Sequence, residues 1–378
     1  MANPFKYGGI VSGADFCNRK SELQDITRAM QNSENLFLYS ERRFGKTSLI
    51  KQALKKLPLN KFRWAYIDLW PTDSDVSFAT TFAKAISESM SSSTKKLIEF
   101  AKIFFGHLSP SISIDEEGKP KITFGFSGNY QTGLDIEEIF EVPSKISERR
   151  KCKIIIVFDE FQQILEYDSD YIERRLRSSI QNHKNVSYIF LGSRKHLIQK
   201  MFLNKTHPLY RIGGHYPLKP INEKNWLPFI QKKFLEYNKN ISNELIFSIC
   251  HLTEGHPFYT QHLCHSLWEL CKENTSITSQ DINMAVNILL NRESYAYITR
   301  WESIGKNQKR FLKGLALESE GVKTFSSEFF LKYRLRSASN VQRAAEALLE
   351  RDIIDRENGY FVIIDRFFKI WIKKIQSV

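Results

Sequence analysis

The sequence predicts an α/β fold with a parallel sheet and helices on both of its faces, followed by a helical region and a C-terminal module of three helices and a hairpin. Three observations lead to this prediction. In the first two thirds of the chain, short apolar runs alternate with amphipathic stretches. Beyond Asn222 the pattern turns mainly helical, and beyond Ile304 three helical patterns precede two β-prone arms around "RENG". These changes divide the chain into residues 1–221, 222–303 and 304–378.

Four buried strands are expected in the first part, because each contains a short, mainly apolar run, as strands covered on both faces do. The strands are expected at 35–40, 63–70, 152–160 and 186–193, and helices between them at, for instance, 77–90 and 170–181. One segment breaks this rhythm. Residues 109–128 alternate apolar and polar side chains around "EEGKP", which predicts an inserted β-hairpin. A partner contact and an oligomer contact are both open as its role.

The last part has the helix, helix, helix, hairpin order that is typical of a winged helix. Its helices are expected at 308–317, 326–335 and 337–351, with Ser326 and Ser337 as N-caps. Residues available to face a phosphate backbone are Arg334, Arg336, Asn340 and Arg343. Acidic residues on the same helix and hairpin argue against a DNA-reading face; they are Glu346, Glu350, Asp352, Asp355 and Glu357. DNA and protein therefore both stay open as partners.

The composition is basic, with 55 Lys and Arg against 42 Asp and Glu, a net charge of +13. This balance favours polyanionic partners, although a solvated surface rich in lysine is the plain alternative. No apolar run approaches the roughly 18 residues of a membrane helix, and the first residues lack the apolar core of a secretion signal. Five widely spaced cysteines without a C-x-x-C pair suit reduced thiols better than disulfides or zinc. We therefore expect a cytoplasmic protein with no membrane partner.

The stretch "LFLYSERRFGKTSLI" at 36–50 joins an apolar strand, a short loop and a helical pattern. This order is typical of a phosphate-binding loop, in which backbone N–H groups and a helix N-terminus converge on the phosphates. Gly45 lets the backbone approach the phosphate, Lys46 would reach the β and γ phosphates, and Thr47 would hold Mg²⁺. Ser40 stands where the pattern G-x-x-x-x-G-K-[ST] has its first glycine. A chance G-K-T and a degenerate site are therefore the alternatives.

The run "KIIIVFDEFQQI" at 153–164 supplies the carboxylates that a chance G-K-T would lack. Asp159 ends an apolar strand and suits the Mg²⁺ shell, while Glu160 suits the polarisation of an attacking water. A buried strand that happens to end in two acids is the alternative for this run alone. Together with the upstream loop, the run predicts a P-loop NTPase.

Five motifs follow one another in the order seen in the archaeal-type ATPases: "RRFGKTSLI", "VFDEFQ", "IFLGSR", "HPLYR" and "GHPFY". Over most of its length the chain resembles this family, which belongs to the STAND and AAA+ branch of P-loop NTPases. The opening "FCNRKSELQDI" resembles the family's box near the nucleotide base. The ending "IIDRFFKIWIKK" resembles its C-terminus, with Arg366 where proline is usual. The resemblance implies an AAA+-like ATPase core, a helical lid over 222–303 and a C-terminal winged helix.

The resemblance also implies roles for single residues. Ser193 stands at the sensor 1 position, where Asn is common, and an ordinary strand-to-loop turn is the alternative. Arg211 resembles an arginine that stabilises γ-phosphate charge in cis or from a neighbouring subunit, with Arg194 as a competing candidate. His256 and Pro257 match a lid element that touches the nucleotide. Further nucleotide contacts are implied for Arg19, Arg43, Phe44 and Ser48.

The expected activity is slow, Mg²⁺-dependent hydrolysis of ATP to ADP, acting as a nucleotide-driven conformational switch. Lys46, Thr47, Asp159 and Glu160 would carry the chemistry. The alternative is a nucleotide-gated module that binds DNA or a protein with little turnover. The identity of the partner and homo-oligomer formation stay open.

Overall fold

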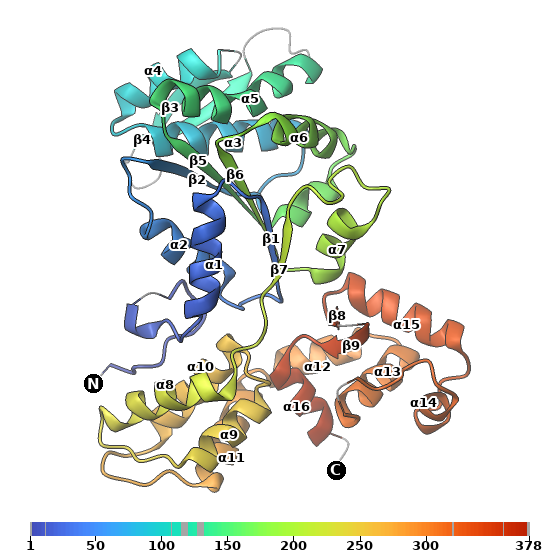
Figure 1. Cartoon of the computed structure of the whole chain (residues 1–378). Helices are drawn as coiled ribbons and strands as arrows, with labels where there is room; N and C mark the ends of the chain where they lie inside the picture. The colour runs from blue at the N-terminus through green and yellow to red at the C-terminus, as the bar shows by residue number, and fades with distance from the viewer. Residues whose placement is uncertain are drawn as a thin grey trace. The chain divides into compact units, whose positions relative to one another are not determined.

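The computed structural model describes residues 2–375, apart from 12, 107, 115–119, 127–131, 320 and 358. The chain forms two compact units, whose elements are labelled in Figure 1. The sheet unit comprises Lys20–Ser40 and Lys46–Leu218, and the helical unit comprises Met1–Arg19, Glu41–Gly45 and Lys219–Val378. The loop Glu41–Gly45 therefore belongs to the helical unit, although it connects two segments of the sheet unit. The division at 221 and 303 stays a prediction.

The sheet unit is built on a five-stranded parallel sheet with the strand order β2-β5-β6-β1-β7. Its strands are β1 (Leu36–Tyr39), β2 (Phe62–Asp68), β5 (Lys153–Asp159), β6 (Val186–Gly192) and β7 (Gly214–Pro217). The parallel sheet is confirmed, and the four predicted strands lie at the predicted places. β7 was not predicted, because "GHYP" contains no apolar run and pairs only at the edge of the sheet.

Helices connect these strands in the alternating order that the sequence predicts. They are α1 (Lys20–Gln31), α2 (Lys46–Lys55), α3 (Asp75–Met90), α5 (Thr132–Arg150), α6 (Tyr171–Asn182) and α7 (Lys195–Leu203). At the start of α3, the side chains of Ser74 and Ser77 cap each other's backbone N–H groups, which fixes where the helix begins. The core of the unit is rich in aromatic rings in contact with one another, from both helices and strands, among them Phe78, Phe82, Phe140, Phe158 and Phe190.

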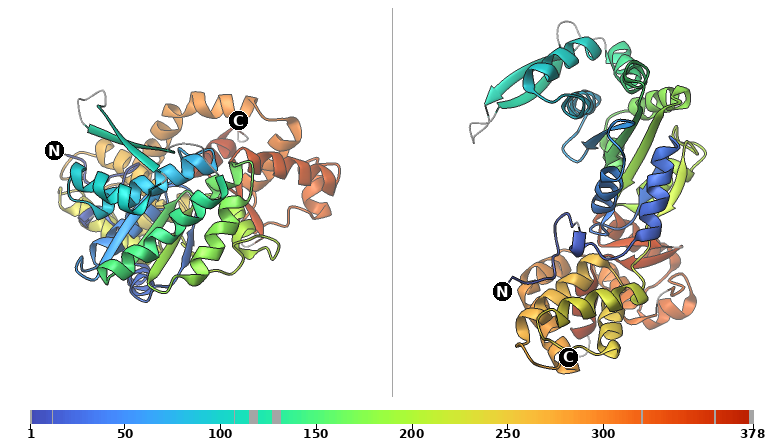
Figure 2. Two further views of the ribbon diagram at one scale, coloured as in Figure 1. Left: turned by 90° about the horizontal axis from the view of Figure 1, so that it is seen from above. Right: turned by 60° about the vertical axis from the view of Figure 1, so that its left-hand side comes forward.

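An antiparallel hairpin occupies the segment where the insertion was predicted. Its strands are β3 (Leu108–Ile114) and β4 (Pro120–Phe126), and the helix α4 (Thr94–Phe104) precedes it. The hairpin packs against α3 and α4, and its two strands extend beyond these helices (Figure 2). Most of the predicted turn at 116–120 lies outside the described residues.

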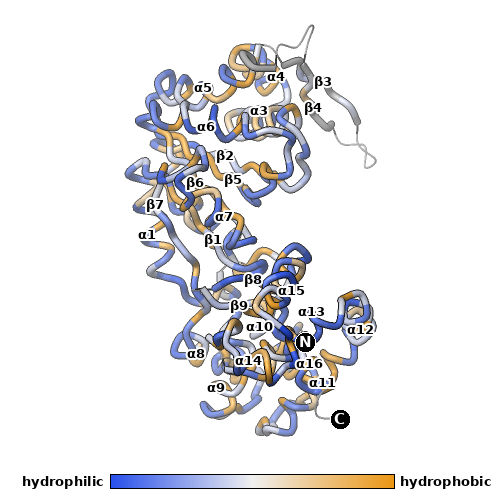
Figure 3. The backbone as a smooth tube through the Cα atoms, turned by 90° about the vertical axis from the view of Figure 1, so that its right-hand side faces the viewer, coloured by the Kyte–Doolittle hydropathy of each residue, from blue (hydrophilic) through white to orange (hydrophobic). Residues whose placement is uncertain are grey.

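The helical unit begins with the short helix η1 (Gly13–Asp15) and continues after the sheet with α8 (Glu223–Leu235), α9 (Asn243–Leu252), α10 (Pro257–Leu270), α11 (Ser279–Arg292) and α12 (Ser294–Glu302). Side-chain oxygens of Asn222, Ser242 and Thr278 accept hydrogen bonds from the first turns of α8, α9 and α11. In Figure 3 these helices alternate blue and orange along the tube, as amphipathic helices do.

The end of the chain has the predicted winged-helix order. It consists of α13 (Lys306–Leu317), α14 (Ser327–Lys332), α15 (Ala338–Glu350), the antiparallel strands β8 (Ile354–Glu357) and β9 (Tyr360–Ile363), and α16 (Arg366–Lys374). Both predicted N-caps are confirmed: Ser326 accepts from the N–H of Phe329, and Ser337 accepts from the N–H of Asn340. One hydrophobic core runs through α8–α12 and the winged helix.

All five cysteines carry free thiols. Burial raises the pKa of the thiols of Cys17 and Cys250 to about 12, so both stay protonated at neutral pH. In the part of the chain that the structure describes, no helix is both long enough and apolar enough to cross a membrane.

Candidate functional site

The predicted phosphate loop joins β1 to α2, as such a loop must. β1 ends at Tyr39, which pairs with Gly192 of β6, and α2 begins at Lys46. The ammonium group of Lys46 donates to the carbonyl oxygen of Ser40 at 3.2 Å and lies 3.4 Å from its hydroxyl oxygen. Both residues are buried. The serine that departs from the glycine pattern thus supplies polar contacts for the lysine at the start of the helix.

The backbone of the loop turns through two left-handed residues, Arg43 with φ 61° and Gly45 with φ +87°. At Gly45 a side chain would be strained by this φ, although no atom stands in the way of a Cβ. The conformation therefore requires glycine directly before Lys46. This is where a phosphate loop needs close backbone approach.

Asp159 lies at the end of β5 and gathers two hydroxyl donors of the sheet unit. The Thr47 hydroxyl donates to its Oδ2 at 3.0 Å, and the phenol of Tyr66 on β2 donates to the same oxygen. Burial raises the pKa of the Asp159 carboxyl, while the hydrogen bond from Tyr66 opposes that shift. The structure thus brings the two predicted metal-binding residues, Thr47 and Asp159, into direct contact.

Glu160, the next residue, adopts a left-handed conformation with φ 51° and ψ 44°. Its Oε2 accepts a hydrogen bond from the Ser193 hydroxyl at 2.7 Å and another from the side-chain amide of Gln162. Ser193 directly follows Gly192, where a Cβ would lie 2.3 Å from the side chain of Ile198. Glycine there lets β6 pass close enough for Ser193 to hold the Glu160 carboxylate.

The loop residues of the helical unit contact the start of α10. Phe44 is buried, and its ring meets that of His256 edge to face at 4.5 Å. His256 is itself buried at the start of α10, where its Nδ1 accepts from the N–H of Phe258. The guanidinium of Arg43 lies 4.3 Å from the centre of the Phe258 ring. Arg19 donates to the carbonyl oxygen of Phe44 at 3.4 Å, so it braces the loop backbone.

The remaining predicted residues lie apart from these contacts. The guanidinium of Arg211 lies over the ring of Tyr210 at 5.2 Å, and among the described residues it makes no contact with Glu160 or Ser193. Its competitor, Arg194, pairs with Glu166 at 3.6 Å. Pro257 forms the first turn of α10, and Ser48 is buried within α2.

Sequence reasoning missed three residues that the structure places at these sites: Tyr66, Gln162 and Glu41. Tyr66 could be identified only once the strand order was known. It lies on β2, which brings it to Asp159 because β2 pairs directly with β5. Gln162 stood two residues after the predicted base, and its amide could have been noticed as a donor to that carboxylate. Glu41 is buried in the phosphate loop, a position for which the loop pattern specifies no residue type.

Comparisons with known proteins agree with this fold. A family model described as an ATPase domain predominantly from Archaea matches residues 16–263, and a model of a winged helix domain matches residues 295–374. No curated protein matches the sequence.

Two solved structures have a similar fold. A Walker-type ATPase of Pyrococcus abyssi is 18% identical, with 95% of this chain and 96% of that chain covered and a TM-score of 0.63. The ORC2 protein of Aeropyrum pernix, solved as ADPNP–ADP complexes, is 12% identical, with 96% of each chain covered and a TM-score of 0.50. At these identities the likeness concerns the fold alone. The family model covers most of the chain, and the chain belongs to this family of P-loop ATPase domains found predominantly in Archaea.

Proposed function

We propose that the protein binds ATP at the loop Arg43–Ser48 and hydrolyses it slowly to ADP and phosphate, as a nucleotide-driven conformational switch. The observation that carries the proposal is the contact set of the sheet unit: Thr47 with Asp159, and Glu160 with Ser193. In it a hydroxyl at the start of a helix meets a strand-end carboxylate, and a second carboxylate stands beside it. This is the arrangement that phosphoryl transfer to water requires.

Each residue has a distinct task in this proposal. Lys46 exchanges its contacts with Ser40 for the β and γ phosphates, since phosphate oxygens are stronger acceptors for an ammonium group. Glu160 accepts a proton from the attacking water, and the hydrogen bonds from Ser193 and Gln162 fix the orientation of its carboxylate. Gly45 and the first backbone N–H groups of α2 hold the phosphates. Arg211 stabilises γ-phosphate charge, in cis or in a homo-oligomer from a neighbouring copy.

The polar atoms around Asp159 fit a magnesium ion. Mg²⁺ prefers oxygen ligands, and a carboxylate oxygen and a hydroxyl oxygen stand 3.0 Å apart at Asp159 and Thr47. Burial disfavours the charge of the carboxylate, so a cation beside it would relieve that cost. When bound, Mg²⁺ would neutralise charge on the β and γ phosphate oxygens. Thr47 and Asp159 are the residues that would hold it.

Asp159→Asn tests this assignment. We expect the Mg²⁺ concentration for half-maximal phosphate release from ATP to rise at least about tenfold, because the ion loses a charged ligand. Steady-state phosphate release over a magnesium titration gives the measurement. Asp168→Asn is the matched control, since Asp168 is an exposed aspartate that follows the same strand. An unchanged magnesium requirement in Asp159→Asn would show that the ion is held elsewhere.

The proposal also covers the lid residues, the winged helix and the location of the protein in a reducing compartment. His256 and Pro257 couple the loop to α10, because the ring of His256 touches Phe44. Arg19 holds the loop backbone on the base side of the nucleotide. The five free thiols suit a cytoplasmic protein. A protein partner that reads the nucleotide state through the winged helix fits this role.

A second candidate function is nucleotide-gated binding of DNA, and one cavity favours it. This cavity of about 570 Å³ lies in the winged helix at the starts of α13 and α15. Four cationic side chains line it, Lys306, Arg310, Arg336 and Arg343, together with Asn and Gln side chains and no carboxylate. Acidic residues of α15 and the hairpin therefore lie outside its lining. Such a cavity suits a phosphate backbone.

The salt dependence of DNA affinity tests the second candidate. If the cavity binds DNA, the logarithm of affinity should fall linearly with the logarithm of salt, with a slope of about −0.9 for each phosphate neutralised. Arg336→Ala combined with Arg343→Ala should flatten this slope, whereas Lys323→Ala, an exposed lysine outside the cavity, should change it less. Fluorescence anisotropy of a labelled duplex, with ATP and with ADP, gives the measurement. A flat salt response would favour the protein partner.

A further inference from the structure

The phosphate loop contains a buried carboxylate that the proposed chemistry does not use. Glu41 directly follows Ser40 and is only 1% exposed. A buried carboxylate loses the hydration of its charge, so it stays ionised only beside a cation with well-placed donors. The conformation of this part of the loop therefore depends on whatever pairs with Glu41.

A guanidinium partner of Glu41 comes from the other end of the chain, while Nε2 of His256 lies 4.0 Å from its Oε2. Arg366, the first residue of α16, is 3% exposed and places two guanidinium nitrogens against the two carboxylate oxygens of Glu41. One of these contacts, from Nη2 to Oε1, measures 3.1 Å. A two-pronged pair of this kind fixes both distance and orientation, which a single contact or a lysine would not do.

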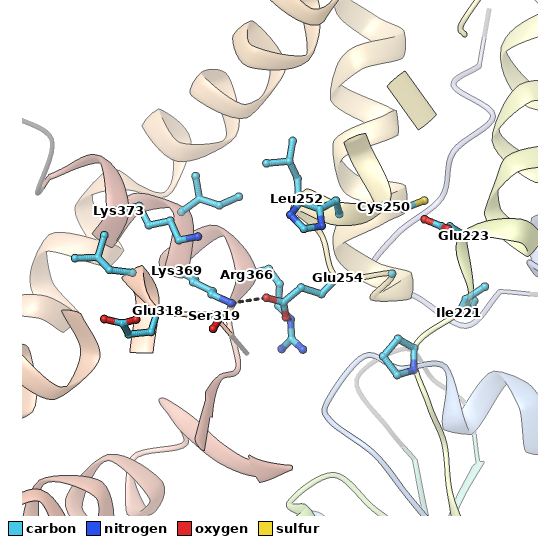
Figure 4. A pocket seen from close by; sticks show the side chains of 15 residues that line it. Ile221, Glu223, Cys250, Leu252, Glu254, Glu318, Ser319, Arg366, Lys369 and Lys373 are labelled. Atoms are coloured by element: carbon cyan, nitrogen blue, oxygen red, sulfur yellow. Dashed lines mark hydrogen bonds and ion pairs between the residues drawn. The ribbon is translucent and has the colours of Figure 1, made fainter. Parts of the chain in front are cut away.

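The third nitrogen of Arg366 ties this pair to the lid segment. Its Nε lies 2.8 Å from Oε2 of Glu254, a residue just before the His256 turn. Lys369 pairs with the other oxygen of Glu254, as the dashed line in Figure 4 shows. Burial alone would raise the pKa of Glu254, but Arg366 and Lys369 hold it below its ordinary value. Two acids and two bases thus form one neutral cluster joining loop, lid and winged helix.

The other residues of the loop are also contacted from the C-terminal part of the chain. Arg42 lies 3.7 Å from Asp352 at the end of α15. Arg43 lies over Phe258 and Phe44 against His256. Of the two ion pairs, that of Glu41 and Arg366 is the more deeply buried, whereas Arg42 and Asp352 are partly exposed. Because exposed pairs contribute little, the Arg366 cluster is the ion pair that can hold the loop in one conformation.

We propose that Arg366 is a positioning residue for nucleotide binding, which lets the winged helix set the conformation of the phosphate loop through Glu41. Docking of α16 then raises nucleotide affinity, and by thermodynamic reciprocity bound nucleotide tightens the docking of α16 by the same factor. The part of this inference that concerns nucleotide affinity rests on the proposed function.

Nucleotide titrations of full-length variants test the inference. Arg366→Met removes the charge but keeps much of the side-chain volume, and it takes the guanidinium away from the buried Glu41 carboxylate. We expect Kd for ATP and KM to rise at least tenfold while kcat stays within threefold, because Lys46, Thr47, Asp159 and Glu160 are untouched. Glu41→Gln combined with Arg366→Met removes both charges and should return Kd to within threefold of the unchanged protein.

Two further variants separate positioning from general destabilisation. Arg300→Met is the matched control, since Arg300 pairs with Asp365 beside Arg366 at 3.7 Å but does not touch the loop; its Kd should stay unchanged. Arg366→Lys keeps the charge without the two-pronged geometry and should give an intermediate Kd. An unchanged Kd in Arg366→Lys would overturn the inference, even where Arg366→Met fails to fold. So would a double variant that binds ATP as weakly as Arg366→Met.

Hydrogen exchange tests the coupling between the loop and α16 without relying on the proposed function. In nucleotide-free protein, Glu41→Ala should speed amide exchange in α16, because the helix loses its anchor on the loop. Unchanged exchange in α16 would overturn the coupling. If the unchanged protein binds no ATP while Glu41→Ala still loosens α16, the proposed function fails and the structural coupling stands.

Discussion

Lys46→Ala is expected to abolish detectable nucleotide binding at micromolar ATP. Removing one partner of a desolvated, hydrogen-bonded charge pair costs about 2–5 kcal/mol, which is at least about 30-fold in Kd. Lys46 is buried, and its ammonium group contacts the carbonyl and hydroxyl oxygens of Ser40 at the start of this loop. Titration of the protein with ATP by calorimetry, with and without Mg²⁺, gives the measurement.

Two comparisons make this result specific. Lys55→Ala removes an exposed lysine from the same helix and should leave ATP binding unchanged. Lys46→Ala also leaves the buried carbonyl of Ser40 without this donor, at a cost of about 1–3 kcal/mol in unfolding free energy. A thermal unfolding curve therefore has to show that the variant is folded. A folded Lys46→Ala protein that binds ATP normally would move the phosphate site away from this loop.

Glu160→Gln should retain ATP binding and lose turnover. A positioned general base contributes about 10²–10⁴-fold to the rate, and the amide cannot accept the proton from water. The side chain keeps its size and can still accept a hydrogen bond from Ser193, so the local structure should survive. Single-turnover phosphate release, with Kd for ATP measured in parallel, separates the two effects.

Glu166→Gln is the control for this experiment, because Glu166 is exposed and its contact with Arg194, at 3.6 Å, is a long one. Its turnover should equal that of the unchanged protein. If Glu160→Gln hydrolyses ATP at the normal rate, another group activates the water, and Glu160 keeps only the role of orienting Ser193 and Gln162.

The parts of the fold that could be predicted are those decided by local pattern. β5 and β6 are apolar over most of their length, and their burial on both faces follows from that composition. The caps at Ser326 and Ser337 follow from a polar residue before an apolar helical stripe. β7 could not be predicted in this way, since a short strand at the sheet edge carries no apolar run.

The candidate site likewise has one part that local patterns predict and one part that they do not. Thr47, Asp159 and Glu160 could be placed because strand-end carboxylates and a loop before a helix are local patterns. The hydroxyl of Tyr66 reaches Asp159 only because β2 pairs with β5, and no short sequence motif specifies the strand order. The pair of Glu41 and Arg366 spans 325 positions of the chain, so only the folded structure brings these two charges together.

The single core of the helical unit bears on how such a chain can change during evolution. Tyr297 of α12 packs against Phe368 at 5.3 Å and Trp371 at 6.0 Å, and its hydroxyl donates to Asp365. The winged helix thus shares its interior with the helices before it, unlike a module joined by an exposed linker. Exchanging it for a foreign winged helix would leave apolar side chains of α12 facing water. Recombination in this region therefore has to move the helices α8–α12 and the winged helix together.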